Sequence, residues 1–158
     1  MPKHALFLCT GNSARSILSE ALTTHLGQGA WVGHSAGSKP TGQIHPGAIA
    51  VLNRHAIKLP NLRSKSWDEF ATPDAPKMDL IITVCDNAAG ETCPIWPGHP
   101  ATAHWGLPDP AAAAPDDIAH AFQFAFTTIH ARIKALMSLT EADLASPDQL
   151  AKIAQIQN

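Results

Sequence analysis

The sequence lacks several features that would assign it to a broad class. Only 15% of its 158 residues are charged and the formal net charge is −2, so it has no basic excess of the kind that binds nucleic acid. No apolar run is long enough to cross a membrane, and residues 1–9 lack the apolar core and cleavage site of a secretory signal peptide. We therefore expect a soluble, cytoplasmic protein that binds neither nucleic acid nor membrane.

Cysteine is also scarce. The chain has three cysteines, Cys9, Cys85 and Cys93. Three thiols in a cytoplasmic protein make a poor disulfide scaffold. Catalysis, redox chemistry, metal binding and core filling remain as alternative roles for them.

Short apolar runs alternate with helical patterns along the chain. Strands are predicted over residues 4–9, 30–35, 79–84 and 102–105, and helices over residues 16–26, 46–55, 67–70, 115–137 and 147–156. This alternation predicts an α/β fold, a single domain in which a doubly wound, four-stranded parallel sheet is flanked by helices. We expect residues 1–138 to form the domain and residues 139–158 an amphipathic tail that packs on it or extends it.

Two of the predicted strands end on a cysteine. Cys9 follows the first strand and Cys85 follows the third. In parallel sheets, ligands bind beyond the carboxyl ends of the strands. We therefore expect the two thiols to open onto the same edge of the sheet.

The segment after the first strand has the composition of an anion-binding loop. Five small or polar residues separate Cys9 from Arg15, and a helical pattern follows. Backbone N–H groups in such a loop, together with the helix dipole, suit a tetrahedral oxyanion, and arginine offers a planar fork. The same field is expected to lower the pKa of Cys9, and the Ser16 hydroxyl can donate to its sulfur. The residues expected to bind the anion are Thr10, Gly11, Asn12, Ser13, Ala14, Arg15 and Ser16. The alternative is a buried structural cysteine beside a solvated arginine.

The loop Cys9-Thr10-Gly11-Asn12-Ser13-Ala14-Arg15-Ser16 resembles the active-site loop of the low-molecular-weight tyrosine phosphatase superfamily. Its Cys-Thr-Gly-Asn-Ser form is most similar to the arsenate reductase branch. Ser35-Ala36-Gly37 and Asp109-Pro110 also match, and the resemblance covers roughly residues 4–137. It implies the superfamily's fold and a general-acid role for Asp109, whereas an aspartate between two prolines can equally be a simple turn residue.

A second segment, residues 84–94, resembles the redox segment of thioredoxin-coupled arsenate reductases, and His104-Trp105-Gly106 matches the residues that follow it there. The resemblance implies a relay: Cys9 attacks arsenic, Cys85 attacks the Cys9 adduct, and Cys93 then forms a disulfide with Cys85 that thioredoxin reduces. The residues alone show only that two thiols separated by a glycine-containing loop can pair if the loop folds back.

Other roles for these two cysteines stay open. Cys85 can be a core residue at a strand end, and Cys93 an idle loop thiol. A zinc site of Cys85, Cys93, His99 and His104 is a further alternative, but the seven residues between the cysteines exceed the usual spacing of two to four.

The sequence departs in two informative places from the superfamily that it resembles. It contains no tyrosine, and Asp109-Pro110 is followed by alanines 111–114 where tyrosine phosphatases carry aromatic residues. Asn12 and Glu20 resemble potassium ligands of some relatives, but Lys65 stands where their aspartate would be. We therefore expect no bound metal and no tightly bound cofactor, with thioredoxin as external reductant.

The expected activity is reduction of arsenate to arsenite, with phosphate and sulfate as competing oxyanions. One alternative is a phosphatase that needs Cys9, Arg15 and Asp109 only. Another is a non-enzymatic oxyanion-binding or redox-sensing module. The histidines His25, His55, His120 and His130 are predicted to be scattered over helix surfaces without forming a cluster.

Overall fold

A four-stranded parallel sheet organises the chain. The computed structural model describes residues 1–59, 61–85 and 100–157. The strands are β1 (Lys3–Leu8), β2 (Trp31–Ala36), β3 (Leu80–Thr83) and β4 (Ala101–His104), in the order β2-β1-β3-β4. All three neighbouring pairs are parallel. The predicted α/β class and four strands are confirmed.

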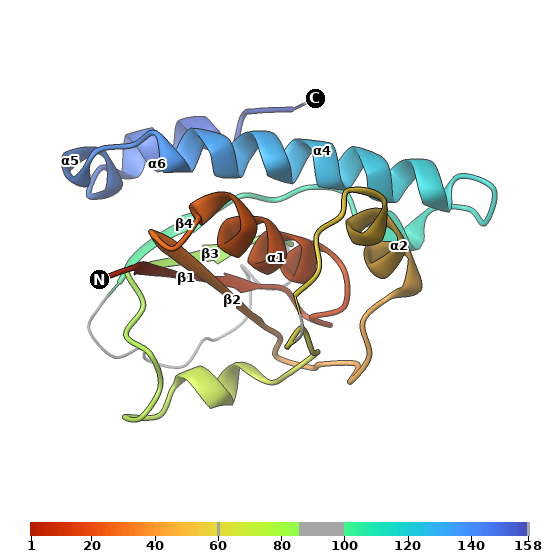
Figure 1. Cartoon of the computed structure of the whole chain (residues 1–158), viewed down its shortest axis with the longest axis horizontal. Helices are drawn as coiled ribbons and strands as arrows, with labels where there is room; N and C mark the ends of the chain where they lie inside the picture. The colour runs from red at the N-terminus through yellow and green to blue at the C-terminus, as the bar shows by residue number, and fades with distance from the viewer. Residues whose placement is uncertain (60, 86–99, 158) are drawn as a thin grey trace.

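The side chains of β1 alternate between the two faces of the sheet. Ala5 and Phe7 belong to the main hydrophobic cluster, whereas Leu6 and Leu8 belong to a smaller one with Phe70. The main cluster lies beneath α1 (Arg15–Gly27), α2 (Pro46–Arg54) and α4 (Ile118–Met137), and the smaller one lies beneath η1 (Trp67–Phe70). Figure 1 shows α1 between the sheet and α4, and η1 on the opposite side. Both faces of the sheet are therefore covered, as a buried parallel sheet requires.

Helix α4 packs through a continuous apolar stripe. Its buried residues include Phe122, Phe126, Ile129, Ile133 and Leu136, spaced by three or four. The helix begins at Ile118 and not at residue 115, because Pro115, Asp116 and Asp117 form a turn closed by the Asp117 N–H and the Ala114 carbonyl at 2.8 Å. A short η2 (Pro110–Ala112) precedes this turn.

Residues after α4 form two short helices. Helix α5 (Glu141–Leu144), which the apolar pattern does not predict, begins with a capping box between Thr140 and Asp143. Helix α6 (Pro147–Ile153) ends before the predicted residue 156, and Ser146 caps it as expected. Leu150 and Ile153 are buried in the main hydrophobic cluster. None of the helices in the described ranges has the length and apolarity needed to cross a bilayer.

Candidate active site

The candidate site lies where β1 and β3 end side by side. Leu8 pairs with Thr83, and the Val84 N–H donates to the Leu8 carbonyl at 2.9 Å. The next residues are Cys9 and Cys85, both buried. The expectation that these thiols share one sheet edge is confirmed, because each continues one of two adjacent parallel strands.

The loop from Cys9 to Arg15 is fixed by its carbonyl groups. The carbonyls of Thr10, Gly11 and Ser13 accept hydrogen bonds from the backbone N–H groups of residues 39, 41 and 45, at 3.0, 3.0 and 2.9 Å. Within the described residues, no backbone carbonyl accepts from the N–H groups of residues 12–15. These N–H groups therefore have no backbone acceptor among the described residues and are available at the start of α1, where an anion would bind.

Asn12 holds the turn of this loop. Its φ is +46°, a left-handed conformation that asparagine tolerates better than most residues. The side chain is completely buried. Its Nδ2 donates to Ser16 Oγ at 2.8 Å, and its Oδ1 accepts from the Lys65 N–H at 2.8 Å. Asn12 therefore ties the loop both to α1 and to the segment before η1.

The buried Lys65 contacts the residues that hold this loop. Lys65 is 7% exposed, and its Nζ lies 3.3 Å from Glu20 Oε1 and 2.8 Å from the Arg63 carbonyl oxygen. Ser35 Oγ also donates to Glu20 Oε1 at 2.6 Å. Lys65 thus contacts both residues that resemble potassium ligands: its ammonium lies beside Glu20, and its backbone N–H donates to Asn12.

Gly37 allows the end of β2 to reach the base of the loop. A Cβ at this position would lie 2.4 Å from the Thr10 carbonyl oxygen and 2.7 Å from that of Cys9. Because both neighbours are backbone atoms, no side chain can move aside to admit it. The Ser35-Ala36-Gly37 motif therefore has a packing reason: only glycine fits against the loop.

Arg15 links the loop to the segment that carries Asp109. Its Nη1 donates to the Leu107 carbonyl at 2.9 Å, and its Nη2 lies 3.8 Å from Asp109 Oδ2. The Arg15 side chain is 14% exposed and that of Asp109 is 43% exposed. Asp109 also caps η2 by accepting from the Ala111 N–H at 3.0 Å. The arginine and the carboxyl group therefore lie close to each other at the end of the loop.

The Cys85 thiol affects the ionisation of Cys9. Thr10, the residue after Cys9, has its Oγ1 3.8 Å from Cys85 Sγ. The pKa of Cys9 is raised above its ordinary value, first by the neighbouring Cys85 thiol and then by burial; the Arg15 charge and a hydrogen bond from the Gly11 N–H act in the opposite direction. The expected lowered pKa is therefore wrong for this arrangement, because the neighbouring thiol and burial outweigh the positive field.

Comparison with known proteins places this geometry in a family. The model of the low molecular weight phosphotyrosine protein phosphatase family matches residues 4–150. The chain belongs to that family. Arsenate reductases are among its relatives: one from Bacillus licheniformis is 38% identical over 113 residues, covering 70% of this chain and 76% of the relative. Another, from Bacillus cereus, is 34% identical over 139 residues, covering 88% and 97%.

Solved structures in the family have the same architecture. An arsenate reductase in its phosphate-binding state superposes with a TM-score of 0.70 at 26% identity, covering 86% of this chain and 97% of the other. A thioredoxin-dependent arsenate reductase from Corynebacterium glutamicum gives a TM-score of 0.62 at 26% identity, covering 85% of this chain and 60% of the other. The low molecular weight phosphatase fold predicted from the loop motif is thus confirmed.

The described residues bring together most of the predicted site, with two differences. Cys93 lies outside them, as does His99, so the relay's third thiol and the zinc alternative fall beyond the described ranges. Ser16 Oγ accepts from Asn12, so its recorded partner is the loop's own asparagine and not the Cys9 sulfur. Ser16 is therefore a structural member of this family's loop.

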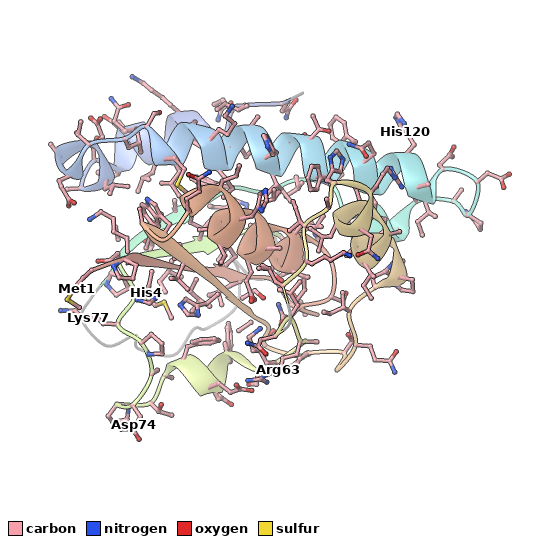
Figure 2. The ribbon with its side chains drawn as sticks, in the orientation of Figure 1. Met1, His4, Arg63, Asp74, Lys77 and His120 are labelled. Atoms are coloured by element: carbon pink, nitrogen blue, oxygen red, sulfur yellow. The ribbon has the colours of Figure 1, made fainter. Side chains whose placement is uncertain are left out.

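The prediction that the helix histidines do not cluster is wrong for three of them. His25, His55 and His130 line one cavity of about 280 Å³, together with Ile57, Phe126 and Thr127. Burial lowers the pKa of His130, and the charges of Lys134, His55 and His25 lower it further. The sequence hides this cluster because its members come from α1, from the residue after α2 and from α4. His120 projects from the outer side of α4 (Figure 2) and is exposed.

Sequence reasoning missed residues that hold the site in place. His45 donates its N–H to the Ser13 carbonyl, accepts from the Gly47 N–H at 2.9 Å, and stacks on Phe122. Its position just before Pro46, at the start of a predicted helix, is the signal of an N-cap. Arg132 is a second such residue. It lies within the buried, apolar stripe of α4, where a charged side chain is unusual and indicates a specific role.

Proposed function

We propose that this chain is an arsenate reductase that uses Cys9 and Cys85 as successive thiols. The observation that carries the proposal is that two buried thiols, Cys9 and Cys85, directly follow β1 and β3, whose ends pair at Leu8 and Thr83 beside an oxyanion loop. A hydrolase needs one nucleophile there, whereas a reductase needs a second thiol within reach of the first. The arsenate reductases among its relatives support the same conclusion.

Arsenate binds to the N–H groups of the loop and to the guanidinium of Arg15. Cys9 must lose its proton, and the Arg15 charge and the Gly11 N–H are the groups that favour its thiolate. The thiolate attacks arsenic, a sulfur–arsenic bond forms, and an arsenic–oxygen bond breaks. Asp109, 3.8 Å from Arg15, protonates the oxygen that leaves as water.

Cys85 performs the reduction. Its thiolate attacks the Cys9 sulfur, so a disulfide forms and the sulfur–arsenic bond breaks. The electron pair of that bond stays on arsenic, which passes from the pentavalent to the trivalent state and leaves as arsenite. The two thiols together supply the two electrons.

Cys93 and an external dithiol close the cycle. The Cys93 thiolate attacks Cys85, which releases Cys9 and leaves a Cys85–Cys93 disulfide. Thioredoxin then reduces this disulfide and is itself oxidised. The thioredoxin-dependent relative supports this choice of reductant, and phosphate and sulfate are expected to compete with arsenate for the loop. A cytoplasmic location suits this chemistry, because free thiols persist in a reducing compartment.

Hydrolysis of phosphomonoesters is a second candidate, favoured by the family's own description. It needs Cys9, Arg15 and Asp109 but neither of the later thiols. The alanines at 111–114 offer no aromatic side chain to hold a phosphotyrosine ring, which argues for the smaller inorganic substrate.

The test follows arsenate-dependent NADPH oxidation with thioredoxin and thioredoxin reductase. The variants are Cys9→Ser, Cys85→Ser and Cys93→Ser, and hydrolysis of p-nitrophenyl phosphate is measured beside it. We expect each variant to lose arsenate turnover, and only Cys9→Ser to lose hydrolysis. Full arsenate turnover by Cys85→Ser and Cys93→Ser would overturn the three-thiol relay.

A further inference from the structure

A second arginine, far from the anion loop, holds the same segment that Arg15 contacts. Arg132 lies on α4 and is only 2% exposed. Its Nη1 donates to the carbonyls of Trp105 and Gly106 at 3.0 and 3.2 Å. The Leu107 carbonyl, on the next residue, accepts from Arg15. The stretch from Trp105 to Asp109 is therefore held between two arginines.

The same guanidinium binds the end of the chain. Arg132 Nη2 donates to the Ala154 carbonyl at 3.0 Å, and its Nε donates to the Ile156 carbonyl at 3.0 Å. Both carbonyls follow α6, where helix C-terminal oxygens carry partial negative charge. Trp105 adds a parallel link, because its indole N–H donates to the Leu150 carbonyl at 3.0 Å.

The hydrogen bonds of the buried Arg132 guanidinium indicate a role beyond filling space in the core. Burial lowers the pKa of Arg132, and no carboxylate among the described residues lies within ion-pair distance of it. Four backbone carbonyls on two segments provide its hydrogen bonds instead. An apolar side chain would bury the tail at lower desolvation cost, but it could not fix the direction of the Trp105 and Gly106 carbonyls, since only hydrogen bonds are directional.

We propose that Arg132 is a positioning residue for the reaction: it anchors the 105–109 segment to the C-terminal tail and so sets where Asp109 and the Leu107 carbonyl stand relative to Arg15. This inference rests on the proposed function, because it gives Asp109 its general-acid role. It also gives residues 139–158 a role, since Ala154 and Ile156, just after α6, supply two of the four carbonyls that orient Arg132.

The decisive experiment is a double-mutant cycle between Arg132 and Asp109. Arg132→Met is expected to lower kcat for arsenate by about 10- to 100-fold, since a displacement of about 1 Å in a catalytic group costs that much. Arg132→Lys keeps the positive charge but loses the planar guanidinium. Its kcat should lie between those of Arg132→Met and wild type. Added to Asp109→Asn, Arg132→Met should cost no more than about twofold, because residues that act through one group are not additive. If the loss of kcat in the double variant equals the product of the losses in the two single variants, the proposal is overturned.

A control and a second readout separate this role from general stability. Thr128→Val changes a buried residue one turn earlier on α4 whose Oγ1 has no hydrogen-bond partner among the described residues; it should leave kcat unchanged. Amide hydrogen exchange of Arg132→Met should rise in residues 105–109 and 154–157 and stay near wild type in β1 and β3. Uniformly faster exchange would reduce Arg132 to a stabilising residue.

The exchange measurement also keeps the two proposals apart. If wild-type protein fails to turn over arsenate, the proposed function falls. The exchange pattern then still decides whether Arg132 fixes the 105–109 segment, and the Asp109 cycle can be read with p-nitrophenyl phosphate.

Discussion

Cys9 and Cys85 end neighbouring strands of one sheet, yet their surroundings differ. Cys9 opens a loop that continues into α1, and it lies in the field of Arg15 and accepts from the Gly11 N–H. Cys85 is the last described residue before 86–99, and its contacts include Cys9 and the Thr10 hydroxyl. The first thiol is thus placed for attack on an anion, whereas the second is placed for attack on the first.

The support beneath the Cys9 loop gives the largest expected effect. Lys65→Met leaves the partly buried Glu20 carboxylate, 15% exposed, without its cation. This should lower the free energy of unfolding by at most about 3–5 kcal/mol. Urea denaturation measures it. Adding Glu20→Gln to this variant removes the unpaired charge and should recover part of the loss. If the double variant is as unstable as the sum of the two single variants, Lys65 and Glu20 do not act as a pair.

Replacing the arginine that acts on Cys9 is expected to come next. Arg15→Lys keeps a charge but loses the planar fork and the bond to Leu107, so kcat/KM for arsenate should fall by about 100- to 1000-fold. Lys39→Ala removes an exposed cation beside the loop and serves as the matched control, since it keeps the backbone N–H that donates to the Thr10 carbonyl. Equal losses in both variants would mean that the loop responds to net charge alone.

Removing the second thiol tests how it affects the first. Cys85→Ala deletes the largest cause that raises the pKa of Cys9, so this pKa should fall. Iodoacetamide alkylation of Cys9 measured against pH then shows its midpoint at lower pH than in wild type. Val84→Ala trims the preceding side chain on the same strand and should leave the midpoint in place. An unchanged midpoint in Cys85→Ala would contradict the contact between the thiols.

A smaller effect is expected from His34, whose protonation makes the stability of the fold depend on pH. The pKa of His34 is lowered to about 4, mainly by burial and then by the charges of His4 and Lys65. The unfolded chain binds this proton near pH 6.5, so folding stability should decline as the pH falls from about 6.5 to 4. His34→Gln should flatten this part of the curve in urea titrations at several pH values. The same decline in His34→Gln as in wild type would assign the effect to other groups.

Much of the fold could be predicted from the sequence because it depends on local patterns. The apolar runs before Cys9 and Cys85, the stripe of α4 and the cap at Ser146 are all visible in short windows. The shared edge of Cys9 and Cys85 also follows from the sequence, since the carboxyl ends of parallel strands meet at one edge of a sheet. The direct pairing of β1 with β3 does not follow from it and is seen only in the fold.

Features that depend on residues far apart in the chain could not be predicted in this way. The raised pKa of Cys9 results from burial and from a thiol on another strand, which no window of the loop contains. The cavity of His25, His55 and His130 is lined from α1, the end of α2 and α4, which are far apart in the sequence. Arg132 acts through carbonyls, which every residue has and no side-chain pattern marks.

The most direct test of the account is a single turnover by the Cys93→Ser variant, quenched in acid and alkylated. Reduced protein is mixed with arsenate without thioredoxin, and arsenite and disulfides are measured together by mass spectrometry. The account predicts one arsenite per chain and a disulfide between Cys9 and Cys85, because both electrons come from these two sulfurs. Arsenite released without that disulfide, or no arsenite at all, would contradict it.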